Sequence, residues 1–186
     1  MDFFRLEGEN IVLRKAVFDD YKSIFKHIWS DKDIYELMLF DPIYNEEDAK
    51  KRINEIIDIQ KNTYTYFVAL KDSDEVIGLC GINEVSKGVY EETGICLSKE
   101  YQSKGYGKEL LNMLLDLAFN KLFAKTFVYA YFKDNIKSKM LAMHFGFKYS
   151  HTEEMIRSWD SKKVIVEYCT LNDEDYKKQK NKAMLN

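Results

Sequence analysis

Gln102-Ser103-Lys104-Gly105-Tyr106-Gly107-Lys108 is the stretch that decides the fold of this 186-residue chain. It follows a strand-like run that ends at Leu97 and precedes a helix-like run over Glu109 to Leu122. Backbone N–H groups at a helix start lack partners inside the helix and lie at the positive end of its dipole, so they bind anions. Gly105 and Gly107 allow a close approach, because a Cβ would clash or forbid the required dihedral angles. We call residues 102–108 the cradle, and it predicts a ligand that carries a pyrophosphate.

Length and composition favour one globular domain over residues 1–186, with a polar tail from about residue 172. Hydrophobic residues make up 46% of the chain, and a chain of this size buries about two-thirds or more of its unfolded surface. It shows no charged-then-apolar start, and no apolar run approaches the roughly 20 residues of a membrane span. We therefore expect a cytoplasmic protein with no membrane partner.

Charge and histidine spacing argue against two classes of ligand. The net charge is −3, whereas a nucleic-acid binder presents a strongly basic face. The three histidines, His27, His144 and His151, lack the spacing of a metal site and have no Asp/Glu cluster to complete one. We expect neither a nucleic-acid partner nor a metal.

The cysteines are predicted to be buried, reduced thiols. They are odd in number, show no C-x-x-C spacing and lie in apolar strand-like segments. Burial raises a thiol pKa and so disfavours a catalytic role. The three are Cys80, Cys96 and Cys169.

Periodicity before the cradle predicts strand, helix, irregular segment, helix and then three strands. The first helix turns Tyr21, Ile24, Phe25 and Ile28 inward, and the second, capped by Asn45 and running to about Lys61, turns Ile53, Ile56 and Ile57 inward. Short polar turns join the three strands, which predicts an antiparallel meander. The ranges are a strand at 10–15, an irregular aromatic segment at 29–44, and strands at 64–70, 76–85 and 89–97.

After the cradle, helix and strand alternate. The helix buries an apolar stripe of Leu110, Leu111, Leu114, Leu115 and Ala118. A strand at 126–132 then predicts a parallel crossover. A helix at 135–145 turns Met140, Leu141 and Phe145 inward and ends at Gly146, and 147–149 pairs with 163–171 in a last hairpin. The fold class is α/β (α+β), with a mixed, mostly antiparallel sheet of about seven strands and about four helices.

This pattern resembles the GNAT superfamily of acyl-CoA-dependent N-acetyltransferases, and within it the RimJ/RimL-like branch of ribosomal-protein N-terminal acetylases and spermidine acetyltransferases. The resemblance covers nearly the whole chain. It is strongest over Gln102 to Gly107, and it is specific because an Asn follows about thirty residues later and a Gly-Phe closes the next helix. The residues that carry it are Leu13-Arg14, Val76-Ile77-Gly78, Glu92-Thr93-Gly94-Ile95, the cradle, Asn135-Ile136-Lys137-Ser138, Phe145-Gly146-Phe147 and Glu167-Tyr168.

The resemblance implies acetyl-CoA as co-substrate, in a sheet splayed at its middle. The free backbone of Ile95-Cys96-Leu97 would pair with the pantetheine amides, as an extended arm adds to an open sheet edge. The cradle would hold the pyrophosphate, with its residues Gln102, Ser103, Lys104, Gly105, Tyr106, Gly107 and Lys108. Asn135 and Ser138 would contact the cofactor arm, although Asn135 also suits a helix cap.

Direct acetyl transfer in a ternary complex needs a neutral amine and a proton for the leaving thiolate. Carboxylates on the central strands are candidate bases, and Glu84 and Glu92 lie on neighbouring predicted strands, with Glu91 on the opposite face from Glu92. Many family members place a general-acid tyrosine where this chain has Ala142. Ser138, one helical turn earlier, resembles the donor of some RimL-like proteins. Tyr129 and Tyr131 are alternative donors, although strand aromatics usually belong to the core.

The acceptor stays open between a protein N-terminus and a small polyamine-like or drug-like amine. Asp31, Asp33 and Asp41, in the segment that resembles the family's acceptor wall, would attract a cation. The alternative function is that of a GNAT-fold module that binds acyl-CoA as a sensor without turnover, which Ala142 slightly favours, because a lost general acid is one route to a non-catalyst. A nucleotide site fits poorly, because the cradle lacks a third glycine and a Gly-Lys-Ser/Thr. The oligomeric state is open, a homodimer included.

Overall fold

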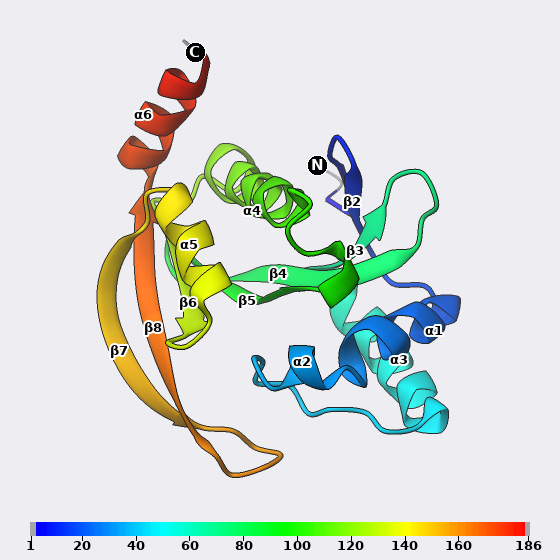
Figure 1. Ribbon diagram of the computed structural model, residues 1–186. Coiled ribbons are helices and arrows are strands. Elements are labelled where there is room, and N and C mark those ends of the chain that lie inside the picture. The colour runs from blue at the N-terminus through cyan, green and yellow to red at the C-terminus, as the bar shows by residue number, and fades with distance from the viewer. Residues whose placement is uncertain (1–2, 185–186) are drawn as a thin grey trace. The chain divides into compact units, whose positions relative to one another are not determined.

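The structure, a computed structural model, describes residues 3–184. The chain divides into two compact units, the first from residues 3–83 and 93–114 and the second from residues 84–92 and 115–184. The described residues form six α-helices and eight strands, in the sheet order β1-β2-β3-β4-β5-β6-β8-β7 (Figure 1). The predicted fold class is confirmed, with one strand and two helices more than expected. The single domain stays a prediction.

Antiparallel pairs organise the strands of the first unit. β1 (Arg5–Glu7) pairs with β2 (Ile11–Arg14), β2 pairs with β3 (Tyr64–Leu70), and β3 pairs with β4 (Val76–Ser86). A short turn then leads to β5 (Val89–Leu97). The predicted strands are confirmed within one or two residues. β1 was missed, because three residues are too few to show alternation.

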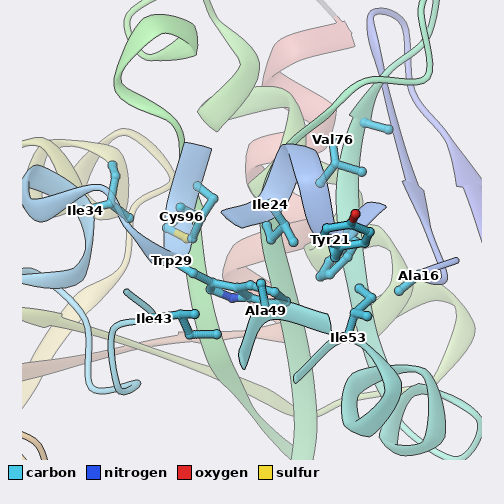
Figure 2. Close-up of a cluster of buried hydrophobic side chains, with 13 residues drawn as sticks. Ala16, Tyr21, Ile24, Trp29, Ile34, Ile43, Ala49, Ile53, Val76 and Cys96 are labelled. Atoms are coloured by element: carbon cyan, nitrogen blue, oxygen red, sulfur yellow. The ribbon is translucent and has the colours of Figure 1, made fainter. Parts of the chain in front are cut away.

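Helical segments of the first unit enclose a core on the face of β3 that carries Phe67. Trp29 is 2% exposed and its ring meets that of Phe67 edge-on at 6.4 Å. Figure 2 shows Trp29 lying among aliphatic side chains of this cluster. The segments are η1 (Phe18–Asp20), α1 (Tyr21–Ile24), the π-helical η2 (Phe25–Trp29), α2 (Lys32–Tyr35) and α3 (Glu46–Gln60).

The segment at 29–44 is more ordered than predicted. Asp31 caps α2 by accepting a hydrogen bond from the N–H of Asp33, at 2.9 Å. The predicted cap of α3 is confirmed, since Asn45 Oδ1 accepts from Asp48 N. Of the aromatic residues in this segment, Trp29 is buried, whereas Tyr44 is 72% exposed.

α4 (Tyr106–Asp116) begins at the cradle and continues as the π-helical η4 (Leu117–Lys121). The predicted apolar stripe is confirmed, because all five of its residues are 0% exposed. This burial, at about 25 cal/mol per Å² of apolar surface, fixes which face of α4 turns inward.

The second unit contains the predicted parallel crossover. β5 pairs in parallel with β6 (Thr126–Phe132) from Val89↔Thr126 to Glu91↔Val128. β6 pairs antiparallel with β8 (Lys163–Asn172), which pairs with β7 (Lys148–Ile156). β7 is six residues longer than the predicted segment, which ended at Tyr149, because its charged and polar residues hide the strand pattern.

One helix of this unit corrects the sequence interpretation, and another adds to it. In α5 (Ile136–His144), Met140 was predicted to point inward but is 59% exposed, and Ala142 is buried instead. The polar tail forms α6 (Asp173–Met184), anchored by Tyr176, which stacks on Phe119 at 4.7 Å. Residues 185–186 of the tail lie outside the described residues.

Candidate functional site

The cradle joins η3 (Lys99–Tyr101), after the end of β5, to the start of α4. Its backbone turns at Ser103 and Gly105, whose φ angles are +62° and +91°. The carbonyl oxygen of Gly105 accepts hydrogen bonds from Lys108 N and Glu109 N, so the helix begins directly after this glycine. An added Cβ at Gly105 would meet nothing within 4 Å. Glycine is therefore required here by its backbone angle and not by crowding.

Hydrogen bonds fix the strand end that precedes the cradle. Gln102 Nε2 donates to the carbonyl oxygen of Leu97 at 2.9 Å, and Ser98 N donates to the carbonyl oxygen of Ile77 at 2.8 Å. A Cβ at Gly78 would lie 2.3 Å from the carbonyl oxygen of Cys96, so only glycine lets β4 pass this closely. Cys96 and Leu97 are buried and Ile95 is half-buried. The side chain of Gln102 thus holds the turn itself.

Glu109 anchors the first turn of α4 to the loop between β1 and β2. Its carboxylate accepts hydrogen bonds from Asn10 N at 2.8 Å, Asn10 Nδ2 at 3.0 Å and Ile11 N at 3.1 Å. Burial by itself would raise the pKa of this carboxyl, but the hydrogen bonds from Asn10 and Ile11 outweigh it and the pKa is lowered. Glu109 is therefore an ionised anchor, which the sequence interpretation did not single out.

In the second unit, the structure brings Ser138 and Tyr129 together. Ser138 Oγ lies 2.8 Å from the hydroxyl of Tyr129, which is 2% exposed. Asn135 Oδ1 accepts from Ser138 N at 3.1 Å, so Asn135 caps α5 and orients Ser138. The cap explanation for Asn135 is confirmed. Contact with a ligand remains a prediction, compatible with the cap.

Both tyrosines of β6 keep their protons at neutral pH. Burial raises the pKa of Tyr129 well above its usual value, despite a smaller opposing effect of the Ser138 hydrogen bond. Burial, followed by a hydrogen bond with Glu167, raises the pKa of Tyr131 to about 12. Ala142 is 2% exposed and offers no polar group. Tyr129 and Ser138 therefore present two protonated hydroxyls that are hydrogen-bonded to each other.

The candidate carboxylates differ in setting. Glu84 is exposed, and its carboxylate accepts a hydrogen bond from Gly88 N at 2.8 Å, which closes the turn between β4 and β5. Glu92 is half-buried, and its charge contributes to the raised pKa of Tyr129. Glu91 is also half-buried; burial first, and then the charge of Glu153, raise its pKa. A raised pKa suits a base near neutral pH, and sequence pattern alone gave no signal for it at Glu91.

The cysteines are free and buried, as predicted. Burial raises the pKa of the Cys169 thiol to about 12, and its Sγ lies 3.2 Å from the carbonyl oxygen of Tyr129. A thiol of this kind stays protonated and unreactive. Within residues 3–184, no helix is long and apolar enough to cross a membrane.

Comparison with known proteins points to one family. The sequence model of the acetyltransferase (GNAT) domain family matches residues 10–148 of this chain. The chain is 30% identical over 122 residues to the uncharacterized N-acetyltransferase p20 of Bacillus licheniformis, covering 63% of this chain and 67% of that protein. It is 23% identical over 140 residues to the uncharacterized N-acetyltransferase YnaD of Bacillus subtilis, covering 75% of this chain and 80% of that protein.

Solved structures share the fold. A GCN5-related N-acetyltransferase from Brucella melitensis superposes with a TM-score of 0.83 at 15% identity, covering 100% of this chain and 87% of that one. The microcin C7 self-immunity acetyltransferase MccE, solved with acetyl-CoA and AMP, superposes with a TM-score of 0.75 at 18% identity. The match covers 88% of this chain and 93% of that one.

Proposed function

Since the chain belongs to the GNAT acetyltransferase family, we propose that this N-acetyltransferase moves an acetyl group from acetyl-CoA to a primary amine, as a member of the RimJ/RimL-like branch. The observation that carries the proposal is the cradle, in which a glycine at φ +91° starts α4 directly after a turn. A pyrophosphate is the anion that such a helix start suits.

Both backbone groups and side chains are proposed to bind the cofactor. The N–H groups of the cradle bind the pyrophosphate, and the exposed ammonium groups of Lys104 and Lys108 complement its charge. Backbone groups of Ile95 to Leu97 pair with the pantetheine amides. Asn135 and Ser138 contact the arm near the thioester.

The proton chemistry is assigned to hydroxyls and carboxylates. When the amine attacks the thioester carbonyl and the C–S bond breaks, Ser138 donates its hydroxyl proton to the leaving thiolate. It takes up the proton of the Tyr129 hydroxyl in return, and water restores the proton of Tyr129 before the next turnover. Among carboxylates, Glu84 and Glu92 stay candidates for removing the proton of the amine. We add Glu91, because burial and then the charge of Glu153 raise its pKa, which is the direction expected of a base that acts near neutral pH.

The acceptor is a protein N-terminus or a small polyamine-like or drug-like amine. Asp31, Asp33 and Asp41 supply negative charge in the segment at 29–44, and the ion pair of Asp33 with Lys99 offsets part of that charge. Such surface attraction is modest and falls with added salt.

Release of free CoA thiol from acetyl-CoA, measured against a panel of amines and N-terminal peptides, tests the proposal. Amine-dependent release, with matching acetylated product by mass spectrometry, is expected. Binding of acetyl-CoA with no turnover on any acceptor would instead support the sensor, which the missing general acid at Ala142 favours. An absence of CoA binding in calorimetry would reject both.

A further inference from the structure

We propose that His27 is a positioning residue for the cradle. This proposal rests on the function proposed above for residues 102–108. His27 lies in η2, 71 residues before Ser98, and its side chain is 4% exposed. Its contacts all lie within the first unit. Through them it fixes the turn that leads into the cradle.

Both ring nitrogens of His27 have partners from separate parts of the chain. Nε2 lies 3.0 Å from Oε1 of Glu75, just before β4, and Nδ1 lies 3.4 Å from Oγ of Ser98, just after β5. A buried polar group is costly unless it is hydrogen-bonded, so these contacts select one position of the ring. His27 thereby ties the start of β4 to the end of β5.

The network continues into the cradle. The second carboxylate oxygen of Glu75 accepts a hydrogen bond from the hydroxyl of Tyr101 at 3.1 Å. The Tyr101 ring packs edge-on against His27 at 6.0 Å and lies 6.5 Å from that of Tyr106, the first residue of α4. Lys104 Nζ lies 5.1 Å above Tyr101. The contacts therefore reach residues on both sides of Gly105.

The link persists in either protonation state of the imidazole. In the neutral ring, Nε2–H donates to Glu75 and Nδ1 accepts from the Ser98 hydroxyl, a tautomer inferred from these partners. In the protonated ring, Nδ1–H donates towards Ser98 or towards Glu100, whose Oε2 lies 4.0 Å away. The positioning role thus depends on the placement of the two nitrogens, and an amide side chain can reproduce only one of them.

Two amide variants separate the contacts. The amide of His27→Gln reaches the place of Nε2 and can still donate to Glu75, whereas that of His27→Asn reaches only the place of Nδ1. A lost hydrogen bond to a charged group is worth about a tenfold change in affinity or more. We expect His27→Asn to raise the Kd for CoA about tenfold and His27→Gln to raise it about threefold or less.

A second substrate distinguishes positioning from general damage. S-acetylpantetheine carries the thioester and the pantetheine amides but no pyrophosphate, so kcat/KM for it should fall less than kcat/KM for acetyl-CoA. Equal losses with both substrates, or equal Kd values for CoA in His27→Asn and the unmodified protein, would overturn the proposal.

If His27→Asn does not fold, tyrosine variants test whether the hydrogen-bond network from His27 supports CoA binding. Tyr101→Phe removes only the hydroxyl that Glu75 accepts from, and it should weaken CoA binding about threefold to tenfold. Tyr66→Phe is the matched control, because the buried Tyr66 hydroxyl has no hydrogen-bond partner among the described residues. Equal CoA binding by both variants would reject the network. If the unmodified protein itself fails to bind CoA, the proposed function fails and not the role of His27 alone.

Discussion

The cradle and the Tyr129–Ser138 pair are built in different ways. The cradle consists of consecutive residues whose backbone angles, +62° at Ser103 and +91° at Gly105, shape the proposed anion site. The pair joins two side chains, on β6 and α5, through one 2.8 Å hydrogen bond. A site made of backbone is determined locally, whereas a site made of side chains depends on how strand and helix pack. The two should therefore respond differently to substitution.

The largest effect is expected from charge in the cradle. Gly107→Glu places a carboxylate where the pyrophosphate is proposed to bind, and like charges in contact cost several kcal/mol, so affinity for acetyl-CoA should fall by more than about 100-fold. Titration calorimetry with acetyl-CoA measures this loss of affinity. Asn54→Glu, on an exposed position of α3, is the control with the same change in charge. Normal binding by Gly107→Glu would place the pyrophosphate elsewhere.

Removing the donor hydroxyl should affect turnover and not affinity. Ser138→Ala is expected to lower kcat about 100-fold at saturating acetyl-CoA, in the range of general acid catalysis. Tyr129→Phe should act on the same step, so the double variant should be no slower than the slower single variant.

Tyr149→Phe controls for loss of a tyrosine hydroxyl, since Tyr149 is 65% exposed and its hydroxyl is hydrogen-bonded to that of Thr152. Unchanged turnover in Ser138→Ala would remove Ser138 from the chemistry. Additive losses in the double variant would show that the two hydroxyls act separately.

The pH profile should identify the base. A carboxylate accepts a proton only when ionised, so kcat/KM should fall as the pH drops through the raised pKa of Glu91. Glu91→Gln should remove this acid limb and lower kcat/KM about 100-fold. Glu92→Gln is the matched variant on the opposite face of β5. A lost limb in Glu92→Gln alone would assign the base to Glu92.

Backbone strain in the cradle should be milder than added charge. Gly105→Ala meets no atom within 4 Å but must adopt φ +91°, which costs about 1–2 kcal/mol, so the KM for acetyl-CoA should rise about tenfold. Gly88→Ala carries a similar strain, at φ +77°, in the turn between β4 and β5. It should lower Tm while leaving the KM unchanged. A KM shift of equal size in both variants would contradict a local role for Gly105.

The smallest effect is expected at Glu109, which supports the cradle without belonging to it. Its lowered pKa means that it stabilises the fold above the ordinary carboxyl pKa and ceases to do so as the pH falls and it is protonated. Glu109→Gln should cost about 1 kcal/mol, or roughly 3 °C in Tm, at pH 7. The difference should shrink near pH 3. A constant difference at both pH values would mean that shape, and not charge, matters.

Elements with strong periodicity were predictable. β3 and β6 match their expected ranges because apolar side chains fill most of each segment, and β5 matches because a polar turn precedes it and the cradle follows it. The stripe from Leu110 to Ala118 fixed the inner face of α4. The charged β7 and the polar α6 were not predictable from periodicity. β7 forms because it pairs with β8, and α6 is held in place by Tyr176 stacking on Phe119. Met140 was misassigned because the inner face of so short a helix is set by its neighbours.

The sequence by itself determined the cradle, the order of strands and helices around it, and the caps at Asn45 and Asn135, because each depends on residues close together in the chain. Only the tertiary structure decided which hydroxyl meets Ser138, that Glu91 has a raised pKa, and that His27 reaches Glu75 and Ser98. These depend on burial and on distances between segments far apart in the sequence. Short-range backbone preferences are encoded locally, whereas pKa shifts and side-chain pairs arise only when the folded chain excludes water and brings the groups together.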